Sequence, residues 1–219
     1  MDKNNTSLNK EDYIHKIFVS EHKDLRSIYQ STPIEMQHMQ LRPYEASMIC
    51  MLLKIQGATK VLEIGTLHGY SAAWIAKTVS GIQKIYTIEK SLLHYNKAKE
   101  NFIQYDLADK IEIINGDAAD ILPKLSSIAP FDAIFLDGNK NAYKLYYDYA
   151  VKYLKKGGLL IVDNIFLFGF IEENEAFIAP KYKKMLKNMQ EFNNLLSKSN
   201  YFDTIALPSR DGIAISIKR

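Results

Sequence analysis

Apolar positions recur at helical spacing through the first part of the chain. Aliphatic and aromatic side chains at Tyr13, Ile14, Ile17 and Phe18, and then at Leu25, Ile28 and Tyr29, have the three- and four-residue spacing that is typical of an amphipathic helical segment. Pro33 interrupts this segment. A further helix is predicted to begin at Pro43, since proline is favoured at a first helical position, and to end at Gly57, a common helix terminator.

The pattern changes at Lys60, where short β-branched runs begin to alternate with helical patterns. Strands are predicted at 60–64, 84–88, 110–114, 132–136 and 158–162, and helices at 70–79, 91–105, 118–127 and 140–155. Alternation of this kind, with apolar strands, predicts a parallel sheet with right-handed crossovers and helices on both faces. The fold class is therefore α/β, doubly wound and mostly parallel.

The end of the chain adds one helix and two strands. One face of the helix carries Met185, Leu186, Met189, Phe192 and Leu196. The runs FDTIAL and IAISIK follow, and the turn PSRDG between them predicts an antiparallel pair at the end of the sheet, with an antiparallel last strand. Because no repeat or linker is visible, we predict one domain over 1–219, with a helical cap over 1–57 and an α/β core over 58–219.

Composition and charge narrow the class of protein. The 219 residues are 47% hydrophobic, which suits one globular core, and the net charge of +3 does not by itself indicate nucleic-acid or membrane binding. Cys50 is the one cysteine and cannot form an internal disulfide, so we expect a reducing compartment. The first twelve residues lack the apolar segment of a secretory signal, and no apolar run is long enough to span a bilayer. The expected location is cytoplasmic, away from membranes.

A glycine-containing turn follows the first predicted strand, in the motif LEIGTLHG. Gly65 ends the strand and Gly69 opens the next helix, where the backbone must turn tightly and a ligand can approach it. The dinucleotide pattern G-x-G-x-x-G is absent because position 67 is Leu, which disfavours a nicotinamide oxidoreductase. S-adenosylmethionine (SAM) carries no phosphate, and Glu63 is suited to attract its ammonium group. An ordinary strand-to-helix turn is the alternative reading of the two glycines.

Two further strand ends carry polar groups suited to a nucleoside. Glu89 lies 20 residues after Gly69, where an acid can accept both ribose hydroxyls. Asn115-Gly116-Asp117-Ala118 follows the third strand, and Asp117 can accept a hydrogen bond from an adenine amine. Asp117 can also cap the helix that follows, and the two roles are compatible. Since ligands bind at the carboxyl ends of such strands, these residues strengthen the SAM hypothesis.

The fourth and fifth predicted strands end in carboxylates. Asp137 follows the fourth strand, and Asp163-Asn164 end the fifth. Two carboxylates and an amide are oxygen ligands, which favour Mg²⁺, Mn²⁺ or Ca²⁺ over Zn²⁺. Helix capping is the alternative for each Asp alone, but like charges gathered in one site are costly unless a cation separates them.

Lys140 lies three residues after Asp137 at the start of a helical pattern. If its side chain reaches the same site, a bound cation lowers its pKa and makes it a candidate general base. A solvated surface lysine is the alternative for this residue alone. The predicted catalytic pair is therefore Lys140 and Asp137.

These motifs together resemble the catechol and caffeoyl-coenzyme A O-methyltransferase family in its bacterial branch. The resemblance covers most of the chain from about Met39 and rests on MQLRPYEA, LEIGTLHGYSA, IYTIEK, NGDA, FLDGNKNAY, LLIVDN and LPSRDGIAISIK. It implies a seven-stranded Rossmann-like methyltransferase sheet, a homodimer, a divalent cation on Asp137, Asp163 and Asn164, and Lys140 as base. It also implies SAM contacts, and the full set that we predict is Leu41, Glu63, Gly65, Thr66, Gly69, Ser71, Glu89, Gly116, Asp117, Ala118 and Asp137.

The acceptor is the open part of this reading. The expected reaction moves the sulfonium methyl in line onto a hydroxyl held on the metal, with a small catechol-like aromatic as the expected acceptor. Gly138-Asn139 stand where catechol enzymes of the family carry bulky groups, Ser209-Arg210 replace its usual small pair, and Phe166, Phe168 and Phe170 can form an apolar wall instead. The segment DNIFLFG and the lysines Lys181, Lys183, Lys184 and Lys187 are similar to a branch that methylates 5-hydroxyuridine in tRNA, although a solvated helix face also explains these lysines. Carboxyl methylation of protein side chains is a further alternative.

Overall fold

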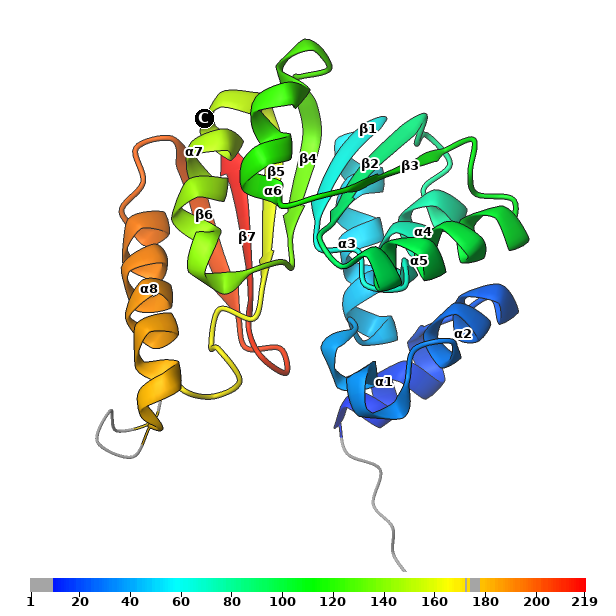
Figure 1. Cartoon of the computed structure of the whole chain (residues 1–219), viewed down its shortest axis with the longest axis horizontal. Coiled ribbons are helices and arrows are strands. Elements are labelled where there is room, and N and C mark those ends of the chain that lie inside the picture. The colour runs from blue at the N-terminus through cyan, green and yellow to red at the C-terminus, as the bar shows by residue number, and fades with distance from the viewer. Residues whose placement is uncertain (1–9, 172, 174–177) are drawn as a thin grey trace, which may run out of the picture.

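A single twisted sheet organises the computed structural model, which describes residues 10–171, 173 and 178–219. Seven strands in these residues pair in the order β3-β2-β1-β4-β5-β7-β6 (Figure 1). Their bounds are β1 (Lys60–Ile64), β2 (Lys84–Glu89), β3 (Ile111–Asn115), β4 (Phe131–Leu136), β5 (Leu154–Asp163), β6 (Phe202–Leu207) and β7 (Ile213–Lys218). Strands β1 to β5 run parallel, and β7 lies antiparallel between β5 and β6. The predicted doubly wound, seven-stranded sheet with an antiparallel last strand is confirmed.

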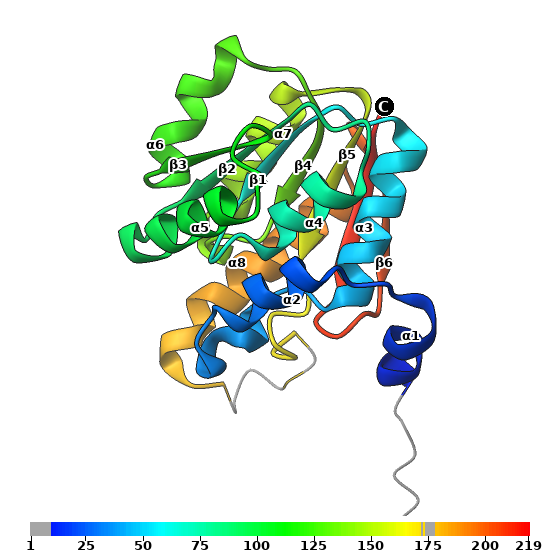
Figure 2. The same cartoon turned by 90° about the vertical axis from the view of Figure 1, so that its right-hand side faces the viewer.

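Helices cover both faces of the sheet and close two separate cores (Figures 1 and 2). One core lies under α3 (Pro43–Gln56), α4 (Tyr70–Thr78) and α5 (Leu92–Gln104). The other lies under α6 (Ala118–Ile121), α7 (Tyr143–Tyr153) and α8 (Pro180–Ser197). The remaining helices are α1 (Lys10–Phe18) and α2 (Lys23–Gln30), with the 3-10 turns η1 (Ile34–Met39), η2 (Leu122–Ser127) and η3 (Lys140–Ala142). Strands with one face toward each core must be apolar on both faces, as the sequence runs indicated.

The strand order creates the position for a site. The chain moves outward from β1 to β2 and β3, and then returns to place β4 on the other side of β1. Loops that leave β1 and β4 therefore diverge, and they open a crevice at the carboxyl ends of these two strands. Every polar strand end singled out in the sequence belongs to β1–β5, whose parallel direction brings those ends to one edge of the sheet.

The helical cap differs from its prediction in one respect. The amphipathic segment over 10–29 divides into α1 and α2, which are separated by residues 19–22, and α1 buries none of its residues. Phe18 is 72% exposed, so the apolar face of α1 does not contribute to the core of a single chain. The helix predicted from Pro43 to Gly57 is confirmed, with Gly57 at φ 69° as its cap. Residues 1–9 of the expected cap lie outside the described residues.

Two other predicted elements have different boundaries. The helix predicted over 118–127 is one α-turn, α6, followed by the 3-10 turn η2, in which Pro123 cannot donate a backbone hydrogen bond. Strand β5 begins at Leu154, four residues earlier than predicted, and so takes over the end of the helix predicted to 155. No helix in the described part of the chain is long and apolar enough to cross a bilayer.

The amino end of β4 contains a buried carboxylate that ties three strands together. Asp132 accepts hydrogen bonds through Oδ2 from the backbone amides of Thr59 and Lys60, both at 2.7 Å, and it pairs with Lys155 Nζ at 2.5 Å through Oδ1. Burial alone raises the pKa of Asp132, but the hydrogen bonds from Lys155 and Thr59 outweigh it and lower the pKa to about 2. This residue therefore links β4 to β5 and to the start of β1 in its ionised form.

Replacing Asp132 by Asn is expected to destabilise the protein in a pH-dependent way. Because the folded-state pKa lies below the ordinary value of 3.8, the ionised carboxylate contributes stability above about pH 4 and loses it as the pH falls toward 2. We expect Asp132→Asn to lower the free energy of unfolding by about 2 kcal/mol at pH 7. Urea denaturation from pH 7 down to pH 2.5 should show the difference from wild type shrinking below pH 4. A difference that stays constant with pH would contradict this role.

Candidate functional site

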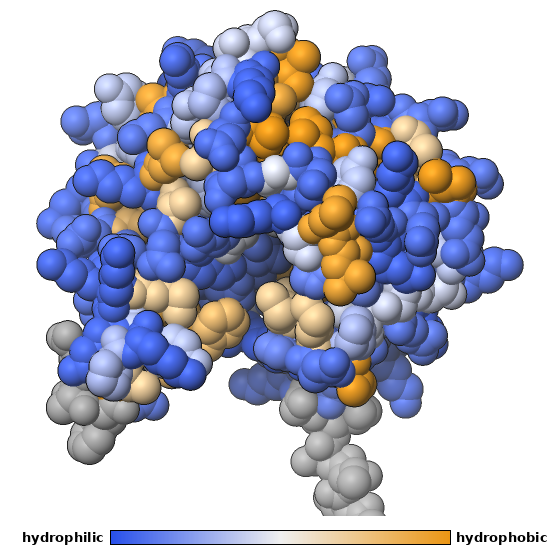
Figure 3. Space-filling view, viewed as in Figure 1, coloured by the Kyte–Doolittle hydropathy of each residue, from blue (hydrophilic) through white to orange (hydrophobic). Residues whose placement is uncertain are grey.

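A cavity of about 410 Å³ lies at the carboxyl ends of the parallel strands. The space-filling view shows a recess in the lower half of the molecule, hydrophilic inside and partly apolar along its rim (Figure 3). Eleven of the predicted site residues line the cavity: Leu41, Gly65, Thr66, Ser71, Glu89, Gly116, Asp117, Ala118, Asp137, Lys140 and Asn164. Residues from β1, β2, β3 and β4 ends thus meet in one place, as the sequence predicted.

Gly65 joins the β1 and β4 sides of the cavity. Its φ is 102°, and a Cβ there would lie 2.4 Å from the backbone oxygen of Asp137. The amide of Asp137 in turn donates to the carbonyl of Ile64 at 2.9 Å. Only glycine allows this approach, because the obstructing atom is backbone and the φ is left-handed. The glycine turn therefore holds Asp137 directly beside the loop that follows β1.

Gly69 has a different function in the structure from Gly65. It precedes α4 with φ 88°, and a Cβ there would lie 2.4 Å from the Phe102 ring of α5. It does not line the cavity. Its small size allows α4 and α5 to pack against each other. This agrees with the alternative that Gly69 belongs to an ordinary strand-to-helix turn.

Glu63 also lies outside the cavity lining, one layer below it. Its carboxylate is fully buried in β1 and accepts hydrogen bonds from the Ser71 hydroxyl and, at 2.5 Å, from the Thr87 hydroxyl of β2. Burial raises the pKa of Glu63 to about 7, against the effect of these two hydroxyls. Ser71 does line the cavity, so Glu63 orients a lining side chain from below.

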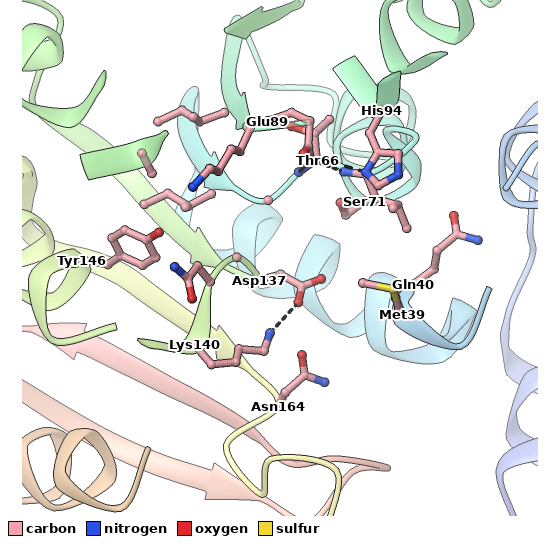
Figure 4. Close-up of a pocket in the computed structure, with 18 of the residues that line it drawn as sticks. Met39, Gln40, Thr66, Ser71, Glu89, His94, Asp137, Lys140, Tyr146 and Asn164 are labelled. Atoms are coloured by element: carbon pink, nitrogen blue, oxygen red, sulfur yellow. Dashed lines mark hydrogen bonds and ion pairs between the residues drawn. The ribbon is translucent and has the colours of Figure 1, made fainter. Parts of the chain in front are cut away.

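Glu89 organises the opposite wall. Its Oε2 accepts hydrogen bonds from the amides of Thr66 at 3.2 Å and Leu67 at 2.9 Å, and its Oε1 accepts from the amide of Ser91 at 2.8 Å. Figure 4 shows Glu89, Thr66 and His94 together on one side of the cavity. His94 Nδ1 lies 3.9 Å from Glu89 Oε1. The glycine turn after β1 is thus held by the acid at the end of β2.

The turn after β3 caps a helix and also reaches the cavity. Asp117 accepts a hydrogen bond from the amide of Ala119 at 3.0 Å and so caps α6, and it also lines the cavity. Lys90 Nζ lies 2.8 Å from Asp117 Oδ2, and this contact lowers the pKa of Asp117.

The second half of the site is a group of charges, of which Lys140 and Asp163 are buried and Asp137 is half-buried. Lys140 Nζ donates to Asp137 Oδ1 at 3.0 Å, from the side of the cavity where Asn164 also lies (Figure 4). Burial raises the pKa of both Asp137 and Asp163. Burial alone lowers the pKa of Lys140, but the nearby Tyr143 and Asp137 outweigh it and raise that pKa. This direction is opposite to the lowering expected from the sequence for a lysine beside a bound cation, and the solvated-surface alternative for Lys140 is wrong because the side chain is buried.

The loop after β5 carries Asn164 in an unusual backbone conformation. Asn164, Leu167 and Phe168 all have left-handed φ values between 52° and 59°. Asp211, just before β7, accepts the amide of Phe168 through Oδ1 at 2.6 Å, and its own carbonyl accepts the amide of Phe166 at 2.9 Å. The β6–β7 turn therefore holds this strained loop in place.

A second cavity of about 360 Å³ adjoins the first on the side of this loop. The two share Met39, Gln40, Asn164 and Phe168. The remaining lining residues of the second cavity are His38, Glu45, Asp163, Gly169, Arg210 and Asp211. Asp163 lines this cavity and not the first, so the two predicted carboxylate ligands face different sides of one opening.

Several lining residues were not found from the sequence. Met39 and Gln40 precede the predicted Leu41, His94 lies in the first turn of α5 a few residues after Glu89, and Tyr146 and Met185 come from α7 and α8. Proximity in sequence to a predicted residue is a usable signal for the first three. Tyr146 and Met185 lie on apolar helical faces and carry no such signal.

The possible metal ligands are few. Among the residues that the structure describes, no three His, Cys, Asp or Glu side chains form a cluster able to hold a metal ion. A cation at Asp137 and Asp163 would therefore depend on the amide oxygen of Asn164 as a third protein ligand, which is the set expected from the sequence.

Comparisons with known proteins agree with this geometry. The family model described as O-methyltransferase matches residues 14–219. The chain is 28% identical over 190 residues to a catechol O-methyltransferase from Mycobacterium tuberculosis, a match that covers 86% of this chain and 85% of that protein. It is 26% identical over 210 residues to a caffeoyl-CoA O-methyltransferase from Populus kitakamiensis, covering 93% and 89%.

A solved structure extends the likeness to three dimensions. The crystal structure of an O-methyltransferase from Bacillus cereus in complex with SAH superposes with a TM-score of 0.83 at 26% identity, covering 95% of this chain and 96% of that one. The family match spans far more than half of the sequence, and the strand order and the cavity agree with it. The chain belongs to the O-methyltransferase family, as a SAM-dependent enzyme of the catechol and caffeoyl-CoA type.

Proposed function

We propose that this enzyme transfers the methyl group of SAM to a hydroxyl of a small, catechol-like aromatic acceptor, with a divalent cation held by Asp137, Asp163 and Asn164. One observation carries the proposal. The half-buried Asp137 and the buried Asp163 have raised pKa values and line two adjoining cavities, and the amide Asn164 lines both of these cavities. One cavity then takes the methyl donor and the other takes the acceptor.

We assign SAM to the larger of the two cavities. The methionine part is assigned to Leu41, Gly65, Thr66 and Ser71, which line one end beside Asp137. Glu89 retains acceptor capacity for one ribose hydroxyl, since a carboxylate has about four lone-pair sites and three are taken by amides. The turn Gly116-Asp117-Ala118 is assigned to the adenine.

The donor set fits a hard divalent cation. Gathering Asp137 and Asp163 in a buried site is unfavourable for two negative charges, and Lys140 offsets only one of them. Carboxylate and amide oxygens suit Mg²⁺, Mn²⁺ or Ca²⁺. Such a cation would supply Lewis acidity that favours the ionised form of the acceptor hydroxyl. Asp211 supports the set by fixing the loop that carries Asn164.

A cation on Asp137 would lower the pKa of Lys140, and Lys140 in its neutral form is then assigned as the group that removes the hydroxyl proton. Its Nζ is held by Asp137 at 3.0 Å and lines the donor cavity close to where the two cavities meet. Met39 and Phe168 line both cavities, and their apolar side chains suit the faces of an aromatic ring. Holding acceptor oxygen and methyl carbon roughly 3 Å apart then accounts for much of the rate.

A hydroxyuridine of tRNA is the second candidate acceptor. Lys181, Lys184 and Lys187 are exposed on α8, whose Met185 lines the donor cavity, so cations lie near the mouth. If tRNA is the acceptor, its binding should weaken steeply with added salt because phosphate contacts release counterions. Comparing methyl transfer to catechol and to bulk tRNA, each at two salt concentrations, separates the candidates.

Removing the proposed cation ligand is expected to abolish turnover. We expect Asp137→Ala, or excess chelator with the wild type, to lower methyl transfer from labelled SAM to catechol by a factor on the order of a hundred or more. Mn²⁺ binding, followed by electron paramagnetic resonance, should weaken in parallel. Asp148→Ala, an exposed carboxylate of α7, is the matched control and should retain both properties. Full activity in excess chelator would disprove the cation.

Two substitutions of Lys140 distinguish proton transfer from charge alone. Lys140→Arg retains the positive charge but cannot accept a proton, whereas Lys140→Met removes both functions. For a general base we expect both variants to lose roughly a hundredfold in kcat, with SAM affinity little changed. Lys144 is an exposed residue of α7, and Lys144→Arg is the control. If Lys140→Arg keeps near wild-type kcat, the residue acts through its charge.

Glu89→Gln tests the assignment of the donor cavity. Loss of the charge weakens the bonds to ribose, so KM for SAM should rise about tenfold with kcat at saturating SAM nearly unchanged. Glu112→Gln, an exposed carboxylate of neighbouring β3, should leave both constants unaltered. Steady-state kinetics, with the SAM concentration varied at a fixed acceptor concentration, measures KM for SAM and kcat separately. A fall in kcat alone would place Glu89 at the chemistry instead of at the ribose.

A further inference from the structure

The outer end of the second cavity carries a cation that the proposed reaction does not use. Arg210 lies in the turn between β6 and β7, is exposed, and lines this cavity. Its Nη1 donates to the backbone oxygen of His38 at 3.0 Å, a contact across 172 positions of sequence. In the described part of the chain, none of the ion pairs within 4.0 Å involves its guanidinium.

The acidic groups of the same cavity make this cation significant. Glu45, Asp163 and Asp211 also line it and are buried, and burial raises the pKa of each. An anionic ligand entering this cavity meets three acids and one fixed guanidinium. It is favoured only in an orientation that brings its negative charge to Arg210 and keeps it away from the acids.

The walls between the two ends fit an aromatic ring. Met39 is 48% exposed and Phe168 is 53% exposed, and both line the second cavity. A ring placed against these side chains can turn one edge to Asn164 and Asp163, which line the cavity, and another edge to Arg210, which is exposed and lines it as well. A hydroxyl at the first edge then meets Asn164 and Asp163, and a carboxylate at the second edge meets Arg210.

We propose that Arg210 selects acceptors that carry an anionic substituent on the side of the ring opposite the reacting hydroxyl. The substrate class is a hydroxylated aromatic carboxylate. Guanidinium is suited to this role, because its planar donors bind a carboxylate in a bidentate manner. The hydrogen bond to His38 holds the side chain at the rim and so reduces the entropy lost when the ligand binds. This inference rests on the proposed function and specifies its acceptor.

Two matched diols test the inference. We would measure methyl transfer from SAM, with Mg²⁺, to 3,4-dihydroxybenzoate and to the neutral 3,4-dihydroxybenzyl alcohol. For the wild type, kcat/KM should favour the benzoate by about tenfold, which is typical of one charge-assisted contact. Arg210→Ala should raise KM for the benzoate about tenfold and leave KM for the alcohol within about twofold. KM of Arg210→Lys for the benzoate should lie between the wild-type and Arg210→Ala values, because lysine keeps the charge and loses the bidentate geometry.

Arg26→Ala is the control for a general change of charge. Arg26 is an exposed arginine of α2 that pairs with Glu21 and lines neither cavity, so its loss should affect the two diols equally. Equal use of both diols by the wild type, or an equal loss for both in Arg210→Ala, would overturn the role of Arg210.

Failure of the proposed function would give a result distinct from failure of the role of Arg210. If neither diol is methylated, the acceptor class is wrong, and calorimetric titration of 3,4-dihydroxybenzoate into protein saturated with SAH then decides about Arg210. Binding that is lost in Arg210→Ala supports an anion-selective site. Absence of binding to the wild type, or methylation of bulk tRNA with neither diol bound, overturns the inference.

Discussion

The close approach of Gly65 to the backbone of Asp137 is the contact on which the rest of the site depends. A side chain at position 65 would collide with the Asp137 carbonyl, and the same strand ends are joined by the hydrogen bond from Asp137 to Ile64. This contact places the loop after β1 and the first residue after β4 at one point. The cavity for the methyl donor and the carboxylates beside the second cavity are adjacent for this reason.

Electrostatics imposes the second constraint. Glu63, Glu89, Asp137, Asp163 and Asp211 all come from the same edge of the sheet, and burial raises the pKa of four of them. The hydroxyls that donate to Glu63, the amides that donate to Glu89 and the Lys140 ammonium beside Asp137 each offset part of this cost. A cation and a positively charged sulfonium donor are the ligands that such an edge favours, which agrees with a SAM-dependent enzyme.

Prediction from sequence succeeded where a local pattern reports a local cause. Strand β1 was located to the residue, because a short aliphatic run leads there directly into the glycine turn, and the helix from Pro43 to Gly57 was located by its terminal residues. Prediction from sequence failed where the boundary of a helix or strand depends on packing. The break between α1 and α2 has no glycine or proline to mark it, and the extension of β5 to Leu154 follows from pairing with β4.

The sequence by itself determined the fold class and predicted the edge of the sheet where the cavity lies, with eleven of the residues that line it, because parallel strands bring their carboxyl ends together. Only the tertiary structure decided what each residue touches. It put Glu63 under Ser71, Gly69 against Phe102, and Arg210 beside His38 at the rim of a second cavity. These contacts join segments distant in sequence, and their geometry depends on how the helices and loops pack, which no local pattern encodes.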